Sequence, residues 1–230
     1  VNLDLAKGFV GRGFAVEYVL RRAQGELIQE AQSIGEIVDL KAARVRSVFK
    51  PLKDHIKNRR PDAVLASMWP LTSATIWARA RSGHRCSVVL AEHGVLSGQY
   101  AGRGSLHNAF MRASLRYSTK RADGIACVSQ GVADDLASLT GQDRERFSVI
   151  YNPVPLSPPP DKLARASVDA LWRGDAGKRI ITVGRFKAVK NQALLIDAFA
   201  RLEDPDARLM LVGDGDIRAA LAPHAESRGV

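Results

Sequence analysis

Residues 179–202, RIITVGRFKAVKNQALLIDAFARL, contain a strand pattern, a basic connection and a helix pattern in direct succession. The apolar run 179–184 is rich in β-branched residues and ends at Gly184, which allows a sharp turn. The apolar periodicity then becomes helical from about Asn191 to Leu202. A strand that leads into a helix in this way is typical of an α/β unit with a parallel sheet.

Ligands of open parallel sheets bind beyond the carboxyl ends of the strands, which is where this connection lies. Gly184 lets the backbone turn sharply, and the helix start near Asn191 offers unpaired N–H groups. Arg185 and Lys190 can add charge-assisted hydrogen bonds to a phosphate. Two interpretations remain: a diphosphate site, or a solvated basic loop, because lysine and arginine are common on loops.

Strand patterns alternate with helix patterns along most of the chain, which favours βαβ units and parallel sheets covered on both faces. The predicted fold is α/β, with two Rossmann-like doubly wound domains of which the second is incomplete. The predicted strands are residues 14–20, 36–40, 62–68, 86–94, 124–129, 147–152, 179–184 and 207–213.

Five prolines in NPVPLSPPPDK (152–162) interrupt this alternation, and they cannot continue a helix or a central strand. We therefore predict an N-terminal acceptor-side domain at 1–152 without its first strand, a linker at 153–178 and the start of a C-terminal nucleotide-sugar-binding domain at 179–230. Both ends read as cut. A second domain of only two βα units is expected to leave sheet edges and helix faces unburied.

His93 and Gly94 end a second strand, CSVVLAEHG, again at its carboxyl side. A histidine there can orient a substrate hydroxyl or share a proton, since its pKa lies nearest neutrality. A packing role is the alternative. Glu92 is adjacent to His93, and neighbouring residues of a strand point to opposite faces, so the two are not expected to act together.

The composition excludes several classes of protein. The 230 residues contain no apolar run of roughly 18 residues that could span a bilayer and no visible secretion signal, so the cytoplasm is the expected compartment. Cys86 and Cys127 lie in apolar runs and predict buried thiols. No zinc spacing, P-loop or nucleophile elbow is present, and the Asp214-x-Asp216 pair is explained by a turn and by Asp216 as the N-cap of the last helix.

The net charge of +10 belongs to residues 1–123, which carry 20 Lys and Arg against 10 Asp and Glu. Such an asymmetry indicates an acidic partner. Arg112, Arg116 and Lys120 recur at helical spacing, opposite part of a predicted apolar stripe, and indicate either an anionic membrane surface or a solvated face. Sequence-specific nucleic-acid binding is not expected, since aromatic residues make up only 6%. The apolar stripe is Leu106, Phe110, Ala113 and Tyr117.

Together these motifs resemble glycosyltransferase family 4, whose members are retaining enzymes of the two-domain GT-B architecture. The specific part is GRFKAVKN (184–191) followed by LVGDG (211–215). In the first half, AEHG (91–94), ADGIACVSQGVADDL (122–136) and VIYNPV (149–154) match in order.

The resemblance implies that Arg185 and Lys190 hold the donor's diphosphate and neutralise the charge that builds on it as the glycosidic bond breaks. His93, with Gly94 beside it, is implied to contact the donor sugar near its reacting carbon. Gly184 and Asn191 complete the implied substrate contacts, and Asn191 stands where the family usually has a glycine. The cations replace a metal, so no metal or cofactor is expected apart from the nucleotide-diphosphate sugar as substrate.

The implied function is a hexosyltransferase-type transfer to an acceptor hydroxyl, with retention, in cell-surface polysaccharide or glycolipid synthesis. Its expected partners are a nucleotide-sugar donor, a saccharide or lipid-linked acceptor, and an anionic membrane surface at the inner face. The family's first strand and glycine-rich loop are expected before Val1, and its glutamate pair after Val230. The alternative is a truncated, non-catalytic module that binds a nucleotide sugar or a phosphate.

Overall fold

The computed structural model describes residues 1–153, 169–172, 177–202 and 204–230. The chain forms two compact units, Val1–Pro155 and Leu156–Val230. Most of the predicted linker at 153–178 lies outside the described residues.

The first unit alternates strands with helices, as the apolar patterns predict. The strands are β1 (Glu17–Leu20), β2 (Glu36–Asp39), β3 (Ala63–Ser67), β4 (Ser87–Glu92), β5 (Gly124–Cys127) and β6 (Ser148–Val149). The α-helices are α1 (Asn2–Val10), α2 (Ile28–Gln32), α3 (Phe49–Arg59), α4 (Leu71–Ser82), α5 (Leu96–Gln99), α6 (Ser105–Thr119) and α7 (Gln130–Thr140). Short 3₁₀ turns are η1 (Val45–Val48), η2 (Ala101–Arg103) and η3 (Arg144–Arg146).

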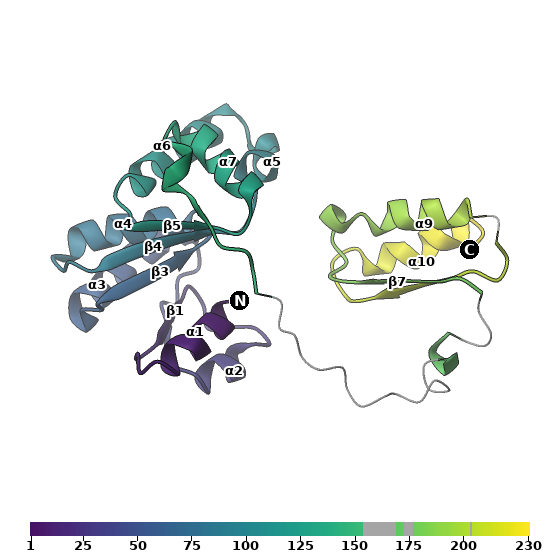
Figure 1. Cartoon of the computed structure of the whole chain (residues 1–230), viewed down its shortest axis with the longest axis horizontal. Coiled ribbons are helices and arrows are strands. Elements are labelled where there is room, and N and C mark those ends of the chain that lie inside the picture. Colours follow the sequence, from purple (N-terminus) through teal and green to yellow (C-terminus); the bar gives the residue numbers. More distant parts are fainter. Residues whose placement is uncertain (154–168, 173–176, 203) are drawn as a thin grey trace. The chain divides into compact units, whose positions relative to one another are not determined.

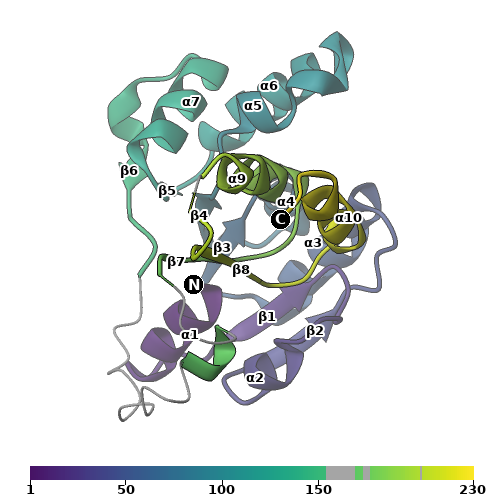
Figure 2. The same cartoon turned by 90° about the vertical axis from the view of Figure 1, so that its right-hand side faces the viewer.

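The strands of this unit form two parallel sheets. One is the pair β1–β2, and the other has the order β3–β4–β5–β6. Within the described residues, no strand pairing joins the two sheets. The β1–β2 pair instead contacts α3 through side chains: Glu17 accepts a 2.6 Å contact from His55 Nε2 and pairs with Arg59 at 3.2 Å. Figure 2 shows the pair side by side, with α1 and α2 next to it.

Helix α3 and the turn η1 before it bury one apolar face. Val48, Leu52 and Ile56 are buried, and they pack with Ile76 and Val88 in one apolar cluster of the four-stranded sheet. A second cluster lies around α6, α7 and β5, where Met111, Leu115, Leu136 and Phe147 are almost fully buried. The four-stranded sheet is therefore held by apolar packing in two adjoining cores.

The predicted stripe on α6 is wrong as a core face. Leu106 is 86% exposed and Phe110 is 55% exposed, and Ala113 is exposed as well. Helical spacing identifies residues that share a face, but it does not say which face is buried. The buried face of α6 is Met111, Ser114, Leu115, Ser118 and Thr119.

Small hydroxyl side chains explain this reversal. Ser118 Oγ lies 3.1 Å from Ser73 Oγ of α4, and Trp69 Nε1 donates to Ser114 Oγ at 3.0 Å. The serines also donate to carbonyls of their own helix, for example Ser118 Oγ to the carbonyl of Ser114 at 2.8 Å. Their polar groups are thus satisfied inside the fold, and α6 approaches α4 with its small side chains while its larger apolar ones stay outside.

A buried carboxyl group holds the turn between β3 and α4. Glu92, at the end of β4, is 3% exposed; one of its oxygens accepts the N–H of Trp69 at 3.1 Å and the other accepts Thr72 Oγ1 at 2.9 Å. No cation compensates this carboxyl in the described residues. Burial therefore raises the pKa of Glu92 to about 7, although the two hydrogen bonds oppose that rise.

The second unit is a parallel pair of strands with two helices. Its elements are β7 (Arg179–Val183), η4 (Ala188–Lys190), α9 (Gln192–Ala200), β8 (Arg208–Val212) and α10 (Arg218–Ser227). Figure 1 shows α9 and α10 on the same side of β7. Their core contains Phe186, Ile196 and Leu221. On the other face Ile181 is 54% exposed and Val183 is 74% exposed, as expected for a sheet covered on one side only.

Two glycines allow the loops after β7 and β8 to touch. Gly213 has a φ of +154°, and a Cβ atom there would lie 2.0 Å from the carbonyl oxygen of Gly184. Gly215 has a φ of +155°, and its Cβ would lie 2.3 Å from the carbonyl oxygen of Phe186. Since L side chains rarely adopt such backbone angles, only glycine fits at either position.

Replacing Glu92 by glutamine is expected to change how stability depends on pH. The folded protein binds a proton at Glu92 up to about pH 7, and the unfolded chain releases it near the ordinary value of 4.5. The wild type therefore loses about 3 kcal/mol of stability from this group as pH rises from 4.5 past 7. In Glu92→Gln the amide oxygen can accept the N–H of Trp69 and the amide nitrogen can donate to Thr72 Oγ1, without a charge. The stability of this variant relative to wild type should therefore rise between pH 5 and pH 8 in urea titrations.

The exposed Glu145 provides a matched control for this measurement. Glu145→Gln makes the same substitution at this exposed position, so its curve shows how much of the change is specific to the buried site. Parallel curves for Glu92→Gln and the wild type would contradict a raised pKa at Glu92.

Gly213→Ala is expected to destabilise the second unit by about 2–4 kcal/mol, because it adds a backbone clash and a strained φ. Hydrogen exchange of the β7 and β8 amides reports this unit separately. Gly184→Ala is the control: a Cβ at Gly184 meets nothing within 4 Å. Equal protection in the two variants would show that the loops do not need to touch.

Candidate functional site

The second unit brings four of the predicted site residues onto one connection. This connection leaves β7 and enters α9, and it contains Gly184, Arg185, Lys190 and Asn191. The loop after β8 supports it: the N–H of Gly184 donates to the carbonyl of Val212 at 2.9 Å, just where the two strands end. The connection is thus held at the carboxyl edge of the β7–β8 pair, which is where ligands of parallel sheets bind.

Arg185 and Lys190 are both exposed, and in the described part of the second unit neither forms an ion pair. By contrast, Lys178 at the start of β7 pairs with Asp204 at 3.1 Å. The 3₁₀ turn η4 fixes the backbone of Lys190. The N–H of Lys190 donates to the carbonyl of Lys187 at 2.8 Å. Two available cations on a fixed backbone are suited to bind an anion such as a phosphate.

Asn191 differs in detail from the expected helix cap. It has a φ of +51°, in the left-handed region, and its side chain makes no capping hydrogen bond. Asparagine tolerates this region better than most residues other than glycine. The conformation explains how Asn191 can stand at a position where a glycine is usual.

Sequence reasoning missed the residue that positions Arg185. Gln192 is 4% exposed, and its Nε2 donates to the carbonyl of Arg185 at 3.1 Å. Its Oε1 is also buried and has no hydrogen-bond partner among the described residues. The signal in the sequence is a polar residue at the first turn of a mostly apolar helix, and only the packed helix shows that this amide is buried.

His93 and Gly94 belong to the first unit, at the carboxyl end of β4. His93 is partly buried, and its ring forms no hydrogen bond within the described residues. Burial lowers the pKa of His93, so the imidazole is neutral at pH 7 and can both donate and accept a hydrogen bond. Glu92 is buried against Trp69 and Thr72, which agrees with the expectation that it does not act together with His93.

The acidic pairs form turns. Asp204 Oδ1 accepts the N–H of Asp206 at 3.1 Å, and Asp214 Oδ1 accepts that of Gly215 at 2.8 Å. The prediction that Asp216 caps the last helix is wrong, because α10 begins two residues later and its preceding residue is Ile217. Over the described ranges, no group of three or more His, Cys, Asp or Glu side chains could hold a metal ion.

None of the described helices combines the length and the apolar composition that crossing a bilayer requires.

Comparisons with known proteins agree with this arrangement. Residues 1–158 match the model described as Glycosyltransferase Family 4, and residues 171–230 match Glycosyl transferases group 1. A relative in Campylobacter jejuni is 32% identical over 117 residues, which are 51% of this chain and 29% of that protein. It is named N-acetylgalactosamine-N,N'-diacetylbacillosaminyl-diphospho-undecaprenol 4-alpha-N-acetylgalactosaminyltransferase.

Two solved structures share the fold. HepE of Anabaena, in complex with UDP and glucose, has a TM-score of 0.73 and 19% identity over 99% of this chain and 62% of its own. Sucrose-phosphate synthase from Thermosynechococcus elongatus has a TM-score of 0.63 and 16% identity over 98% of this chain and 59% of its own. The chain thus spans less than two thirds of each of these three proteins.

The first family model alone covers more than half of the chain, and its residues include His93 and Gly94. The second covers the connection that carries Arg185 and Lys190. The chain belongs to glycosyltransferase family 4, and its parallel α/β units have the fold of the GT-B glycosyltransferases.

Proposed function

We propose that this chain serves a retaining, hexosyltransferase-type glycosyltransferase that moves a sugar from a nucleotide-diphosphate donor to an acceptor hydroxyl. The observation that carries the proposal is the pair of exposed cations, Arg185 and Lys190, on one strand-to-helix connection of a family 4 chain. HepE, which shares the fold, is described in complexes with UDP, with UDP and glucose, and with UDP-glucose. These complexes support a nucleotide-sugar donor here as well.

In this proposal the cations act on the leaving group. Negative charge accumulates on the diphosphate as its bond to the sugar breaks, and fixed positive groups stabilise that charge most strongly in the transition state. Arg185 offers a planar fork of donors, whereas Lys190 offers a compact charge. Gly184 admits the diphosphate close to the backbone, and Asn191 turns the chain into α9, so that the first N–H groups of the helix face the anion.

His93 is proposed to orient the donor sugar. A neutral imidazole can accept a hydrogen bond from one sugar hydroxyl and donate one to another oxygen. Its lowered pKa keeps it in that form at neutral pH. Gly94, directly after it, leaves space at the end of β4, where an added Cβ would come within 3.3 Å of Gln99 Oε1.

The acceptor is proposed to be a saccharide or a lipid-linked saccharide in polysaccharide or glycolipid synthesis, handled in the cytoplasm at the inner face of the membrane. The Campylobacter relative is named for a diphospho-undecaprenol substrate. The positive charge of residues 1–123 and the exposed residues Arg112 and Arg116 of α6 suit an anionic surface.

Arg185→Ala is expected to weaken binding of UDP or another nucleoside diphosphate by roughly ten- to a hundredfold, which corresponds to one lost charge-assisted hydrogen bond. Isothermal titration of the 230-residue chain with UDP, GDP and ADP measures this change. Arg201→Ala removes an equal charge at the other end of α9 and should leave affinity unchanged. Equal losses of affinity in the two variants would show that the net charge of the protein, and not a contact from Arg185, accounts for binding.

His93→Ala is expected to lower sugar transfer by about a hundredfold or more while nucleoside diphosphate affinity changes less than twofold, because the imidazole contacts the sugar rather than the diphosphate. Transfer is measured as release of nucleotide from a panel of nucleotide sugars with lipid-linked acceptors. If the wild-type chain binds nucleotide and transfers no sugar, the non-catalytic binding module is the better description. Full activity of His93→Ala would contradict the assignment of the histidine.

A further inference from the structure

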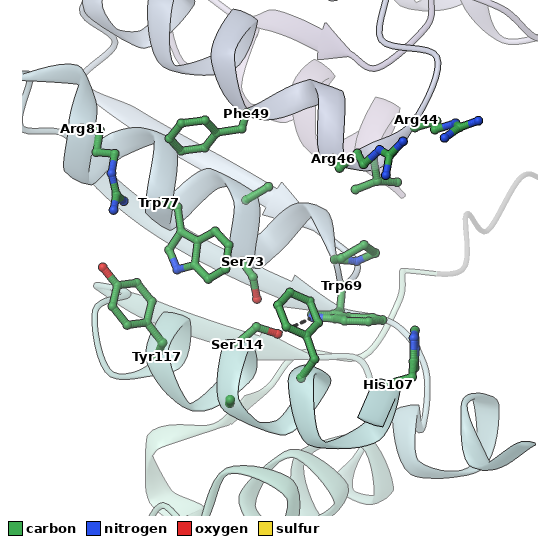
Figure 3. Close-up of a pocket in the computed structure, with 15 residues that line it drawn as sticks. Arg44, Arg46, Phe49, Trp69, Ser73, Trp77, Arg81, His107, Ser114 and Tyr117 are labelled. Atoms are coloured by element: carbon green, nitrogen blue, oxygen red, sulfur yellow. Dashed lines mark hydrogen bonds between the residues drawn. The ribbon is translucent and has the colours of Figure 1, made fainter. Parts of the chain in front are cut away.

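A large groove crosses one face of the first unit, outside the residues assigned above. It lies between η1, α3, α4 and α6 and has a volume of about 1280 Å³. Its walls are mainly aromatic and apolar: Phe49, Trp77, Phe110 and Tyr117 line it, and Trp69 lies at one end (Figure 3). This volume exceeds the roughly 300–1,000 Å³ that is typical of small-molecule sites.

The apolar stripe of α6, which is not part of the core, forms one wall of this groove. Phe110, Ala113 and Tyr117 line the groove. Leu106, one helical turn before Phe110 on the same face, is 86% exposed. Trp77 of α4 meets Phe110 and Tyr117 edge to face, with ring centroids 6.4 and 6.0 Å apart. Exposed apolar surface of this extent is costly in water unless an apolar ligand covers it.

Arginines stand at both ends of the groove. Arg44 and Arg46 lie at the same end as Trp69 and His107 but on the other wall of the groove, and Arg81 lies at the opposite end (Figure 3). All three are exposed, and none forms an ion pair within the described residues. An apolar channel with an arginine pair at one mouth is complementary to a hydrocarbon chain with a phosphate headgroup.

The direction of the groove indicates where the headgroup lies. Trp69 follows the carboxyl end of β3, and β3 pairs in parallel with β4, whose carboxyl end leads to His93. The mouth with Arg44 and Arg46 is therefore at the edge of the sheet that carries the proposed sugar-orienting histidine. At this end of the groove the Nε2 of His107 is buried and has no hydrogen-bond partner among the described residues.

We propose that this groove binds the hydrocarbon chain of a lipid diphosphate, with the diphosphate held by Arg44 and Arg46 at the carboxyl edge of the sheet. The assignment rests on the proposed function in that it names the lipid part of the acceptor. A single lipid molecule fits better than a flat bilayer surface, because the aromatic lining is recessed between helices and runs toward the sheet edge.

Farnesyl diphosphate is a soluble probe with both features of this ligand. Its binding to the 230-residue chain can be followed by titration calorimetry and by quenching of tryptophan fluorescence, since Trp69 and Trp77 both line the groove. We expect saturable binding that is at least tenfold tighter than that of inorganic diphosphate or of farnesol. Equal binding of inorganic diphosphate, or no binding of farnesyl diphosphate, would overturn the proposal.

A pair of alanines on α6 provides matched variants. Ala113 lines the groove and is exposed, whereas Ala109 is exposed on the same helix outside it. Ala113→Phe should fill the groove and weaken farnesyl diphosphate binding at least tenfold, and Ala109→Phe should leave it unchanged. Because both positions are exposed, neither variant is expected to unfold the protein, and circular dichroism verifies this.

Charge variants separate the headgroup from the chain. The double variant Arg44→Ala with Arg46→Ala should lose at least tenfold in affinity for farnesyl diphosphate and little for farnesol. Arg12→Ala, an exposed arginine after α1 that does not line the groove, should lose little for either. Equal losses from Arg12→Ala would contradict a specific headgroup site.

Vesicles distinguish a bound lipid from a membrane surface. If vesicles with anionic phosphatidylglycerol bind the chain and Ala113→Phe does not change farnesyl diphosphate binding, the face is a bilayer contact and the proposal is wrong. Arg185→Ala should not affect farnesyl diphosphate binding. A failure to bind nucleotide would therefore contradict the proposed function, whereas a failure to bind farnesyl diphosphate would contradict the groove proposal alone.

Discussion

Parallel strand pairing is the constraint on which the candidate sites depend. In β3, β4 and β5 it brings the carboxyl ends of three strands to one edge, and in β7 and β8 it does the same for the second unit. Backbone hydrogen bonds fix this arrangement before any functional side chain is considered. His93 lies at one such edge, and the connection with Arg185 lies at the other.

The groups near these edges are held by buried polar contacts of two kinds. In the first unit, the carboxyl group of Glu92 accepts hydrogen bonds from Trp69 and Thr72 and thereby ties the start of α4 to the end of β4. In the second unit, Gln192 holds the carbonyl of Arg185. A buried polar group is stabilising only when it is satisfied, so each of these contacts specifies one backbone conformation rather than adding much net stability.

The contact between α4 and α6 connects the fold with the groove. The hydroxyl groups of Ser114 and Ser118 form hydrogen bonds inside the protein, so these serines lie on the packed side of α6. The aromatic residues of the helix line the open groove instead. The groove ends at Trp69, and the backbone N–H of Trp69 donates to the carboxyl group of Glu92. The carboxyl edge of the sheet, the proposed donor-sugar contact and the mouth of the groove are thus parts of one packed region.

Local pattern in the sequence determined the existence and order of the eight strands found in the described residues and the basic connection at 184–191, because strand and helix periods depend on neighbouring residues alone. Motif spacing identified the family for the same reason. Tertiary structure alone decided that the β1–β2 pair is separate from the four-stranded sheet and that Asn191 is left-handed rather than a side-chain cap. It also decided which side of α6 is buried: periodicity placed Leu106 and Phe110 on one face, but only packing against Ser73 and Trp69 of the α4 region turned that face outward. Such choices depend on contacts between residues far apart in the chain, where hydrogen-bond satisfaction and close packing outweigh the preference of any single helix.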